Sequence, residues 1–203
     1  RDYYWMGGEA LAPIRRPLGP IDIKPLISAA GICGTVIVQT IPDLNETVEF
    51  LEIADDTDFV RGVVGWVDLT APDLPSVLQK LKSGKGGRYL VGIRHQAHDE
   101  DDANWLIRPD VIAGIQHVLD AGLAYDLLLK ERELPAAIKA VDALPKDARL
   151  VVDHIAKPRI AAGEMEPWKE LISEISKRPN VWCKLSGMVT EADWQSWTAD
   201  NLR

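Results

Sequence analysis

The sequence is short of several residue types and patterns, and each shortage excludes a class of protein. It has two cysteines in 203 residues and no uninterrupted apolar run of about 18 residues, which is what a membrane-spanning helix requires. Cys33 and Cys183 lie in apolar, strand-like segments, so we expect reduced core thiols rather than a disulfide framework. We therefore expect no membrane partner.

Positive charge is also in short supply. The chain has 23 Lys and Arg against 31 Asp and Glu, a formal charge of −8. A nucleic-acid partner is not expected, because binding one requires a basic surface that neutralises phosphates. The first residues, RDYYWM, contain no secretory signal pattern, and we expect a cytoplasmic protein. The composition, 46% hydrophobic and 27% charged, fits a single globular domain over residues 1–203.

What is present is a regular alternation of apolar strands and amphipathic helices. Residues 1–20 are expected to form a loop, because they contain Pro13, Pro17 and Gly7–Gly8. After them we predict six strands, at 35–40, 59–69, 89–96, 123–129, 149–155 and 180–187. The predicted helices are 22–30, 43–55, 74–82, 109–121, 134–144 and 166–177.

The spacing of these strands predicts a barrel. Equivalent points recur at intervals of 27, 27, 33, 27 and 31 residues, counted between Val36, Val63, Leu90, Leu123, Leu150 and Val181. Strands alternating with helices form parallel sheets through right-handed crossovers. No GxGxxG motif follows a strand, and polar residues end several strands, which favours a (β/α)8 TIM barrel over an open sheet. Since eight units need about 250 residues, we predict six of the eight, with the first and last units missing.

Alternation along the strands indicates which side chains enter the barrel. In residues 89–96, Ile93 shares a face with His95, and this face suits packing against helices. Arg94 and Gln96 would then point inward, where a guanidinium can bind a carboxylate or a polarised oxygen. His95 is predicted to be a hydrogen-bonded structural histidine. Gln39 would point inward at the end of its strand.

Asp153 and His154 form the most informative polar pair, because they follow the apolar residues 150–152 directly. Strand ends are where α/β barrels place their chemistry. An inward His154 would be an acid/base group or a metal ligand, since imidazole titrates near neutrality. Asp153 would then lie behind it, within reach of the helix layer or of Lys157. The alternative is a satisfied histidine at a strand end.

Other candidates are aromatic or hydroxyl side chains. Tyr4, Trp5 and Trp66 could supply apolar walls for a compact ring, although the aromatic segment near the start could equally pack on the edge of the domain. Ser186 shares a face with Lys184 near the end of the last strand, and we count Ser186 among the substrate-binding candidates. A buried lysine must be paired.

Four segments carry a resemblance to a known family. They are GVVGWVDL at 62–69, VGIRHQ at 91–96, DHIAKP at 153–158 and NVWCKLSGMVTEADW at 180–194. In this order and spacing the chain resembles amidohydrolase-related family 2, the TIM-barrel branch that includes sugar-acid lactonases and pyrone-dicarboxylate lactonase. The resemblance covers nearly the whole chain.

The resemblance implies a hydrolase with its site at the carboxyl ends of the strands. The sixth-strand histidine of the family maps onto His154, and the fourth-strand arginine, which holds a substrate carboxylate or carbonyl, maps onto Arg94. It also implies one divalent metal, often zinc, with His154 as a ligand, although some members act without a metal. The chain departs from the family pattern in lacking the His-x-His pair of the first strand and the aspartate of the eighth.

The expected function is hydrolysis of a small lactone by metal-assisted or His/Asp-assisted attack of water. Because the two missing motifs carry catalytic groups, we expect the 203 residues by themselves to be inactive. A non-oxidative decarboxylase of the same superfamily is one alternative, and a catalytically inactive barrel that acts as a binding module is another. The expected partner is a small-molecule substrate, and a homo-oligomer is left open.

Overall fold

The six predicted strands are all present in the computed structural model, which describes every residue except 1–2, 4–5 and 203. They form one parallel sheet in the order β1-β2-β3-β4-β5-β6. The strands are β1 (Thr35–Val38), β2 (Val60–Gly65), β3 (Leu90–Gln96), β4 (Ala124–Leu128), β5 (Leu150–Val152) and β6 (Val181–Cys183). Strands paired in sequence order confirm the predicted barrel plan, seen here as a half-barrel of six units.

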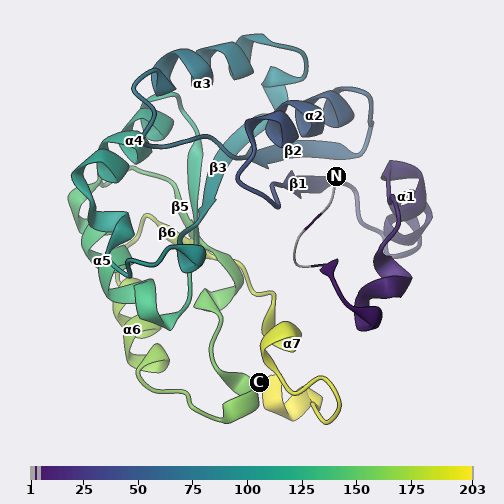
Figure 1. Cartoon of the computed structure of the whole chain (residues 1–203), viewed down its shortest axis with the longest axis vertical. Coiled ribbons are helices and arrows are strands. Elements are labelled where there is room, and N and C mark those ends of the chain that lie inside the picture. Colours follow the sequence, from purple (N-terminus) through teal and green to yellow (C-terminus); the bar gives the residue numbers. More distant parts are fainter. Residues whose placement is uncertain (1–2, 4–5, 203) are drawn as a thin grey trace.

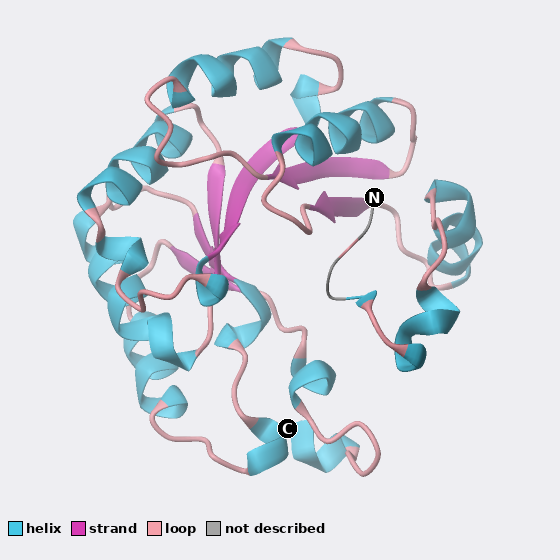
Figure 2. Ribbon diagram, in the orientation of Figure 1, coloured by secondary structure: helices cyan, strands magenta, loops and turns pink. Residues whose placement is uncertain are grey.

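Six of the helices follow the predicted alternation. They are α1 (Pro20–Ala29), α2 (Leu44–Asp55), α3 (Leu74–Ser83), α4 (Pro109–Asp120), α5 (Leu134–Ala143) and α6 (Trp168–Ile175). In Figures 1 and 2, helices α3 to α6 form an arc outside the strands, and α1 lies on the opposite side of the picture. A short helix, α7 (Met188–Glu191), follows β6.

The ends of the chain depart from the predictions. Residues 1–20 do contain regular structure, a 3-10 helix over Glu9–Ile14, which tolerates Pro13 because it is a short, tight coil. The first helix begins at Pro20, two residues earlier than expected, since proline at the first position has no N–H to leave unpaired. None of the helices in the described part of the chain has the length and apolar character needed to cross a membrane.

The core lies between the sheet and the arc of helices. Ile93, Tyr125 and Leu150 are 0% exposed on the outer face of the sheet, and they belong to the same cluster as Ile115 of α4 and Ala137 of α5. Burying a side chain the size of isoleucine contributes about 2 kcal/mol. This confirms that the Ile93 face of β3 packs against helices, which leaves Arg94 and Gln96 facing the barrel interior.

Both edges of the sheet are exposed. Val36 on β1 is 52% exposed and Trp182 on β6 is 54% exposed. Cys33 and Cys183 are free, as expected, but they are exposed, so their prediction as core thiols is wrong. Cys33 lies in the loop before β1 and Cys183 on the edge strand β6, and an edge strand has no neighbour on one side to cover its side chains.

Gly114 shows how closely the helix layer approaches the strand-end loops. It lies in α4, where a Cβ would overlap the carbonyl group of Leu69 in the loop after β2. Alanine normally stabilises a helix relative to glycine by about 1 kcal/mol. Here we predict the reverse: Gly114→Ala lowers the free energy of unfolding by about 1–3 kcal/mol, because the methyl group overpacks the contact.

Urea unfolding followed by circular dichroism measures this change. The control is Ala113→Gly at the neighbouring exposed position, which should cost about 1 kcal/mol through helix propensity alone. A Gly114→Ala protein as stable as the parent, or more stable, would show that α4 does not pack against Leu69 in this way.

Candidate active site

Four charged side chains from neighbouring strands meet inside the half-barrel. Arg94 comes from β3, Asp126 from β4, Asp153 from the residue after β5, and Lys184 from the residue after β6. Asp126 and Asp153 are 2% and 0% exposed. The strand register brings them together. Arg94 lies opposite Asp126 in neighbouring strands, and the backbone N–H of Lys184 donates to the backbone carbonyl of Val152 at 2.9 Å.

Asp153 is the centre of this cluster. Its Oδ2 accepts a hydrogen bond from Arg94 Nη1 at 2.8 Å, and its Oδ1 lies 2.6 Å from Lys184 Nζ. Lys184 also forms a short ion pair with Asp126. Two carboxylates are thus matched by two cations, which is the condition under which charges are tolerated in a barrel interior.

The charged groups of this cluster shift one another's pKa values. Burial, and then repulsion from Asp153, raises the pKa of Asp126 above its usual range, although Lys184 and Arg94 oppose the shift. Burial opposes the charge of Lys184, but the hydrogen bonds and charges of Asp126 and Asp153 outweigh it, and the pKa of Lys184 is raised. Lys184 is therefore a stable cation at neutral pH.

A pair of glutamines extends the cluster to β1. Gln39 is 0% exposed and donates to Gln96 Oε1 at 3.1 Å, while Gln96 Nε2 donates back to Gln39 Oε1 at 3.2 Å. Arg94 Nη2 donates to the backbone carbonyl of Gln39 in a short hydrogen bond. The structure thus places Gln39 and Gln96 inward, as predicted, and their amides satisfy each other. A role for them in binding substrate stays a prediction.

His154 follows Asp153 in an unusual turn. Four consecutive non-glycine residues, 154–157, have φ between 47° and 56°, in the left-handed region. Each such residue costs of order 1 kcal/mol. The turn is held by hydrogen bonds from Ile155 N–H to the Lys184 carbonyl at 3.2 Å and from Trp168 Nε1 to the Ile155 carbonyl at 2.6 Å. Strained backbone of this kind often occurs at functional sites.

The strand register explains where Asp153 points. Asp153 was expected to lie behind His154, toward the helix layer or Lys157, but it points inward to Arg94 and Lys184. The expectation was wrong because it assumed that His154 continues the inward face of β5. Val151 lies opposite Asp126, which lies opposite Arg94, so Val151 and Asp153 share the inward face. Lys157 instead pairs with Glu191 of α7 at 3.0 Å.

The imidazole of His154 is half-buried and contacts the loop after β6. Its Nδ1 lies 2.9 Å from Ser186 Oγ, and its Nε2 has no hydrogen-bond partner among the described residues. Gly187 allows this approach: it has φ 74°, and a Cβ there would lie 2.7 Å from His154 Cβ. Burial, together with the positive charges of Lys157, Arg94 and Lys184, lowers the pKa of His154 despite the opposing charge of Asp153.

The remaining candidates are placed elsewhere. Trp66 Nε1 donates to His95 Nδ1 at 3.0 Å, and His95 Nε2 lies 2.7 Å from Glu100 Oε1. The imidazole of His95 also stacks on Trp105 at 4.2 Å between ring centroids. His95 is therefore a satisfied structural histidine, as predicted, and the polar end of Trp66 serves that cluster. Tyr4 and Trp5 lie outside the described residues.

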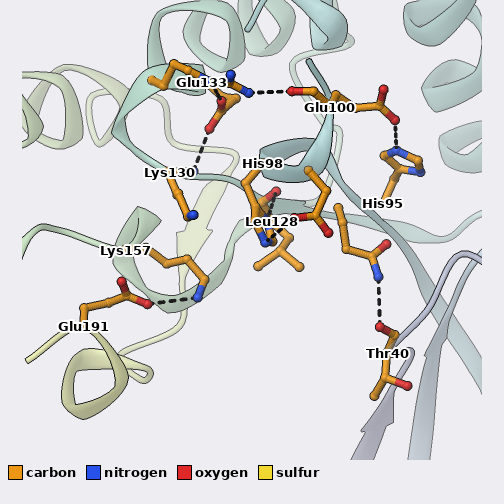
Figure 3. Close-up of polar contacts among 12 residues, drawn as sticks. Thr40, His95, His98, Glu100, Leu128, Lys130, Glu133, Lys157 and Glu191 are labelled. Atoms are coloured by element: carbon orange, nitrogen blue, oxygen red, sulfur yellow. Dashed lines mark hydrogen bonds and ion pairs between the residues drawn. The ribbon is translucent and has the colours of Figure 1, made fainter. Parts of the chain in front are cut away.

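Further polar residues gather above the strand ends (Figure 3). His98 lies 3.4 Å from the carbonyl of Leu128 and 3.3 Å from Asp99. Burial lowers its pKa, and the nearby Lys157 and Lys130 add to the effect. This places two lysines close to His98 at the ends of β4 and β5.

The described residues do not assemble a metal site by themselves. Among them, no group of three or more His, Cys, Asp or Glu side chains is placed to hold an ion. A catalytic zinc normally takes three protein ligands. Asp153, the carboxylate next to His154, is already paired with Arg94 and Lys184. The described residues therefore do not fit such a metal by themselves, and His154 as a ligand stays a prediction.

The geometry around His154 predicts its titration. Because burial and neighbouring cations disfavour the imidazolium, His154 should titrate below the value of about 6.5 that an unperturbed histidine shows. NMR titration of the imidazole Cε1 protons measures this, with the His154→Gln protein assigning the signal. The His117→Gln variant, at an exposed position on α4, is the matched control for assignment. Titration of the His154 signal at or above pH 6.5 would contradict the arrangement.

The comparisons with known proteins agree with this geometry. The family model described as Amidohydrolase matches residues 1–203. The L-fucono-1,5-lactonase of Burkholderia ambifaria is 41% identical over 192 residues, which cover 95% of this chain and 64% of that protein. The L-fucono-1,5-lactonase of Burkholderia multivorans is 34% identical over 200 residues, 96% of this chain and 66% of that protein. The chain thus spans slightly less than two thirds of the length of these relatives.

Solved structures show the same likeness. An amidohydrolase from Burkholderia multivorans with bound zinc has a TM-score of 0.87 at 34% identity, over 98% of this chain and 70% of that one. A probable 2-pyrone-4,6-dicarboxylic acid hydrolase from Acinetobacter baumannii, with citric acid bound, has a TM-score of 0.71 at 15% identity, over 92% of this chain and 67% of that one. The second similarity is one of fold alone. From its sequence and its half-barrel, the chain belongs to the amidohydrolase family.

Proposed function

We propose that the protein hydrolyses a small lactone of the sugar-acid class. The observation that carries this proposal is the placement of His154 beside the buried Arg94–Asp153–Lys184 cluster at the carboxyl ends of the strands. The likeness to two proteins named L-fucono-1,5-lactonase supports the choice of substrate. No observation in the described part of the structure favours decarboxylation over hydrolysis.

His154 is the acid/base group of the proposed reaction. Its lowered pKa keeps the imidazole neutral near pH 7, and Ser186 Oγ lies at hydrogen-bond distance from Nδ1. When Nδ1 carries the proton and donates to Ser186, Nε2 is left as an acceptor. Nε2 can then take a proton from a water molecule whose oxygen adds to the lactone carbonyl carbon.

The second half of the reaction returns that proton. The bond between the former carbonyl carbon and the ring oxygen breaks, and His154 Nε2–H protonates the departing alkoxide. The product is the open hydroxy acid. No step is assigned to a metal ion, because the described residues do not supply a set of ligands for one. The family resemblance implies further catalytic groups, a His-x-His pair and an aspartate, and no step is assigned to them here.

A panel of sugar lactones at neutral pH tests the proposal, with acid release followed by a pH indicator. In a protein that also carries the first- and eighth-strand groups that the family resemblance implies, we expect hydrolysis of at least one five- or six-membered lactone. The rate should fall about 100-fold or more in His154→Ala, since acid/base groups typically contribute this much. His117→Ala on α4 is the matched control and should leave the rate unchanged. An unchanged rate in His154→Ala would remove His154 from the mechanism.

Two added measurements separate the alternatives. Repeating the assay with a chelator shows whether activity depends on a metal ion. Release of CO2 from aromatic acids without lactone hydrolysis would identify a decarboxylase instead. Lactone binding without turnover would identify a binding module.

The pH dependence of the rate provides a second test. A base must be unprotonated to act, so kcat/KM should rise with pH through the pKa of His154 in the free enzyme. Because that pKa is lowered, the half-maximal point of the acid limb should lie below about pH 6.5. An acid limb centred above that value would assign the base to another group. The rate is measured on the same lactone from pH 4.5 to 8.

A further inference from the structure

Lys184 is the exposed member of the buried charge cluster. Its side chain is 34% exposed, whereas those of its partners Asp126 and Asp153 are 3% and 0% exposed. An ammonium group has three N–H donors. Lys184 Nζ donates to Asp126 in a short hydrogen bond and lies 2.6 Å from Asp153 Oδ1, so these two carboxylates occupy at most two of the donors and at least one N–H is left for a ligand.

Arg94 differs from Lys184 in this respect. Its side chain is 10% exposed, Nη1 donates to Asp153 and Nη2 donates to the carbonyl of Gln39. Its Nε is buried without a hydrogen-bond partner among the described residues. Nη1 and Nη2 of Arg94 are therefore both bound within the protein, and the role in holding substrate that the sequence resemblance implies stays a prediction.

Lys184 and His154 also lie near the same part of the site. The positive charge of Lys184 is one of the causes that lower the pKa of His154, so the two groups lie within electrostatic range. The backbone joins them as well, because Ile155 N–H donates to the Lys184 carbonyl at 3.2 Å. A substrate carbonyl that receives water activated by His154 would thus lie near a fixed positive charge.

We propose that Lys184 donates its third hydrogen bond to the carbonyl oxygen of the lactone and stabilises the negative charge that develops there as water adds. This inference rests on the proposed lactone hydrolysis and names the group that binds the reacting oxygen. Arg94 is then a positioning residue, which holds Asp153 so that Asp153 and Asp126 together direct the ammonium group. No proton leaves Lys184 in this step: the oxyanion forms against a full cation and collapses as the ring C–O bond breaks.

The proposed contact with Lys184 also predicts a ligand that binds to the site without reacting. Hydrolysis converts the carbonyl into a carboxylate, which carries negative charge on the oxygens that Lys184 faces. A sugar acid should therefore bind to the site through Lys184 even when no reaction takes place. This provides a measurement that does not depend on turnover.

The test compares variants that keep or remove the charge. Lys184→Met alone leaves Asp126 and Asp153 without their cation and can fail to fold. The double variant Asp126→Asn/Lys184→Met removes one negative and one positive charge, so the interior stays balanced. Lys184→Arg keeps a cation and its donors. Lys139→Met, at an exposed position on α5, is the matched control.

Two readouts are taken for each folded variant: kcat and KM on the best lactone, and binding of L-fuconate by titration calorimetry. For the double variant we expect kcat to fall about 100-fold or more, the loss typical of removing one oxyanion donor, and L-fuconate affinity to fall at least tenfold. Lys184→Arg should retain binding, and its activity should extend to higher pH because a guanidinium does not lose its proton. Lys139→Met should match the parent in both readouts.

The outcomes distinguish the two proposals. A folded double variant with parental kcat and L-fuconate affinity overturns the role of Lys184 and leaves lactone hydrolysis standing. Binding of L-fuconate that depends on Lys184, without hydrolysis of any lactone, supports the contact and overturns the proposed function. A parent protein that neither binds L-fuconate nor hydrolyses a lactone overturns both.

Discussion

The structure depends on one interaction, the pairing of the buried carboxylate of Asp153 with Arg94 and Lys184. A charge that is 0% exposed is tolerated only with partners of opposite sign, and removing one partner of such a pair typically costs about 3–5 kcal/mol. These partners come from β3 and from the residue after β6, on either side of β5, so the ion pairs connect these strands at the carboxyl end of the sheet. They also fix the start of the turn that carries His154. The contacts that stabilise the fold therefore also position His154.

The turn after β5 connects the buried ion pairs of Asp153 to His154. Its left-handed backbone is unfavourable for residues with a Cβ, so it persists only because the surroundings determine it. Hydrogen bonds to the loop after β6 and to Trp168 of α6 supply that support, and Gly187 leaves room for the imidazole. The result is a half-buried histidine whose protonation is set by burial and by nearby cations. Its position is a property of three elements, not of β5 alone.

Most of the fold could be predicted from the sequence, because the signal is periodic. Apolar runs separated by about 30 residues and by amphipathic segments define β/α units, and all six appear in order. Strand alternation was enough to place Arg94 inward and Ile93 against the helices, since both lie within the regular strand β3. The same reasoning placed Asp153 wrongly, because the sequence of β5 does not show which of its faces points inward. The pairing of Val151 with Asp126 shows that Val151 and Asp153 share that face.

The roles of the charged residues were harder to predict, because they depend on pairings between distant strands. In the sequence Lys184 is only a lysine in an apolar strand, and Asp126 cannot be told from its neighbour Tyr125. Lys184 and Asp126 lie close to Asp153 only because β4, β5 and β6 pair in this register, and no local sequence pattern encodes that register. For the same reason the sequence did not show that Nη1 and Nη2 of Arg94 donate to Asp153 and to the carbonyl of Gln39. The role of Arg94 in binding substrate stays a prediction. The family resemblance identifies equivalent positions in the chain, but it does not show which atoms the side chains at those positions contact.

The most direct test of this account is a crystal structure of the protein with L-fuconate bound. We expect Asp153 between Arg94 and Lys184, and a carboxylate oxygen of the ligand about 3 Å from Lys184 Nζ, on the same side as the imidazole of His154. A ligand bound at another end of the sheet, or an Asp153 side chain turned toward the helices, would contradict it.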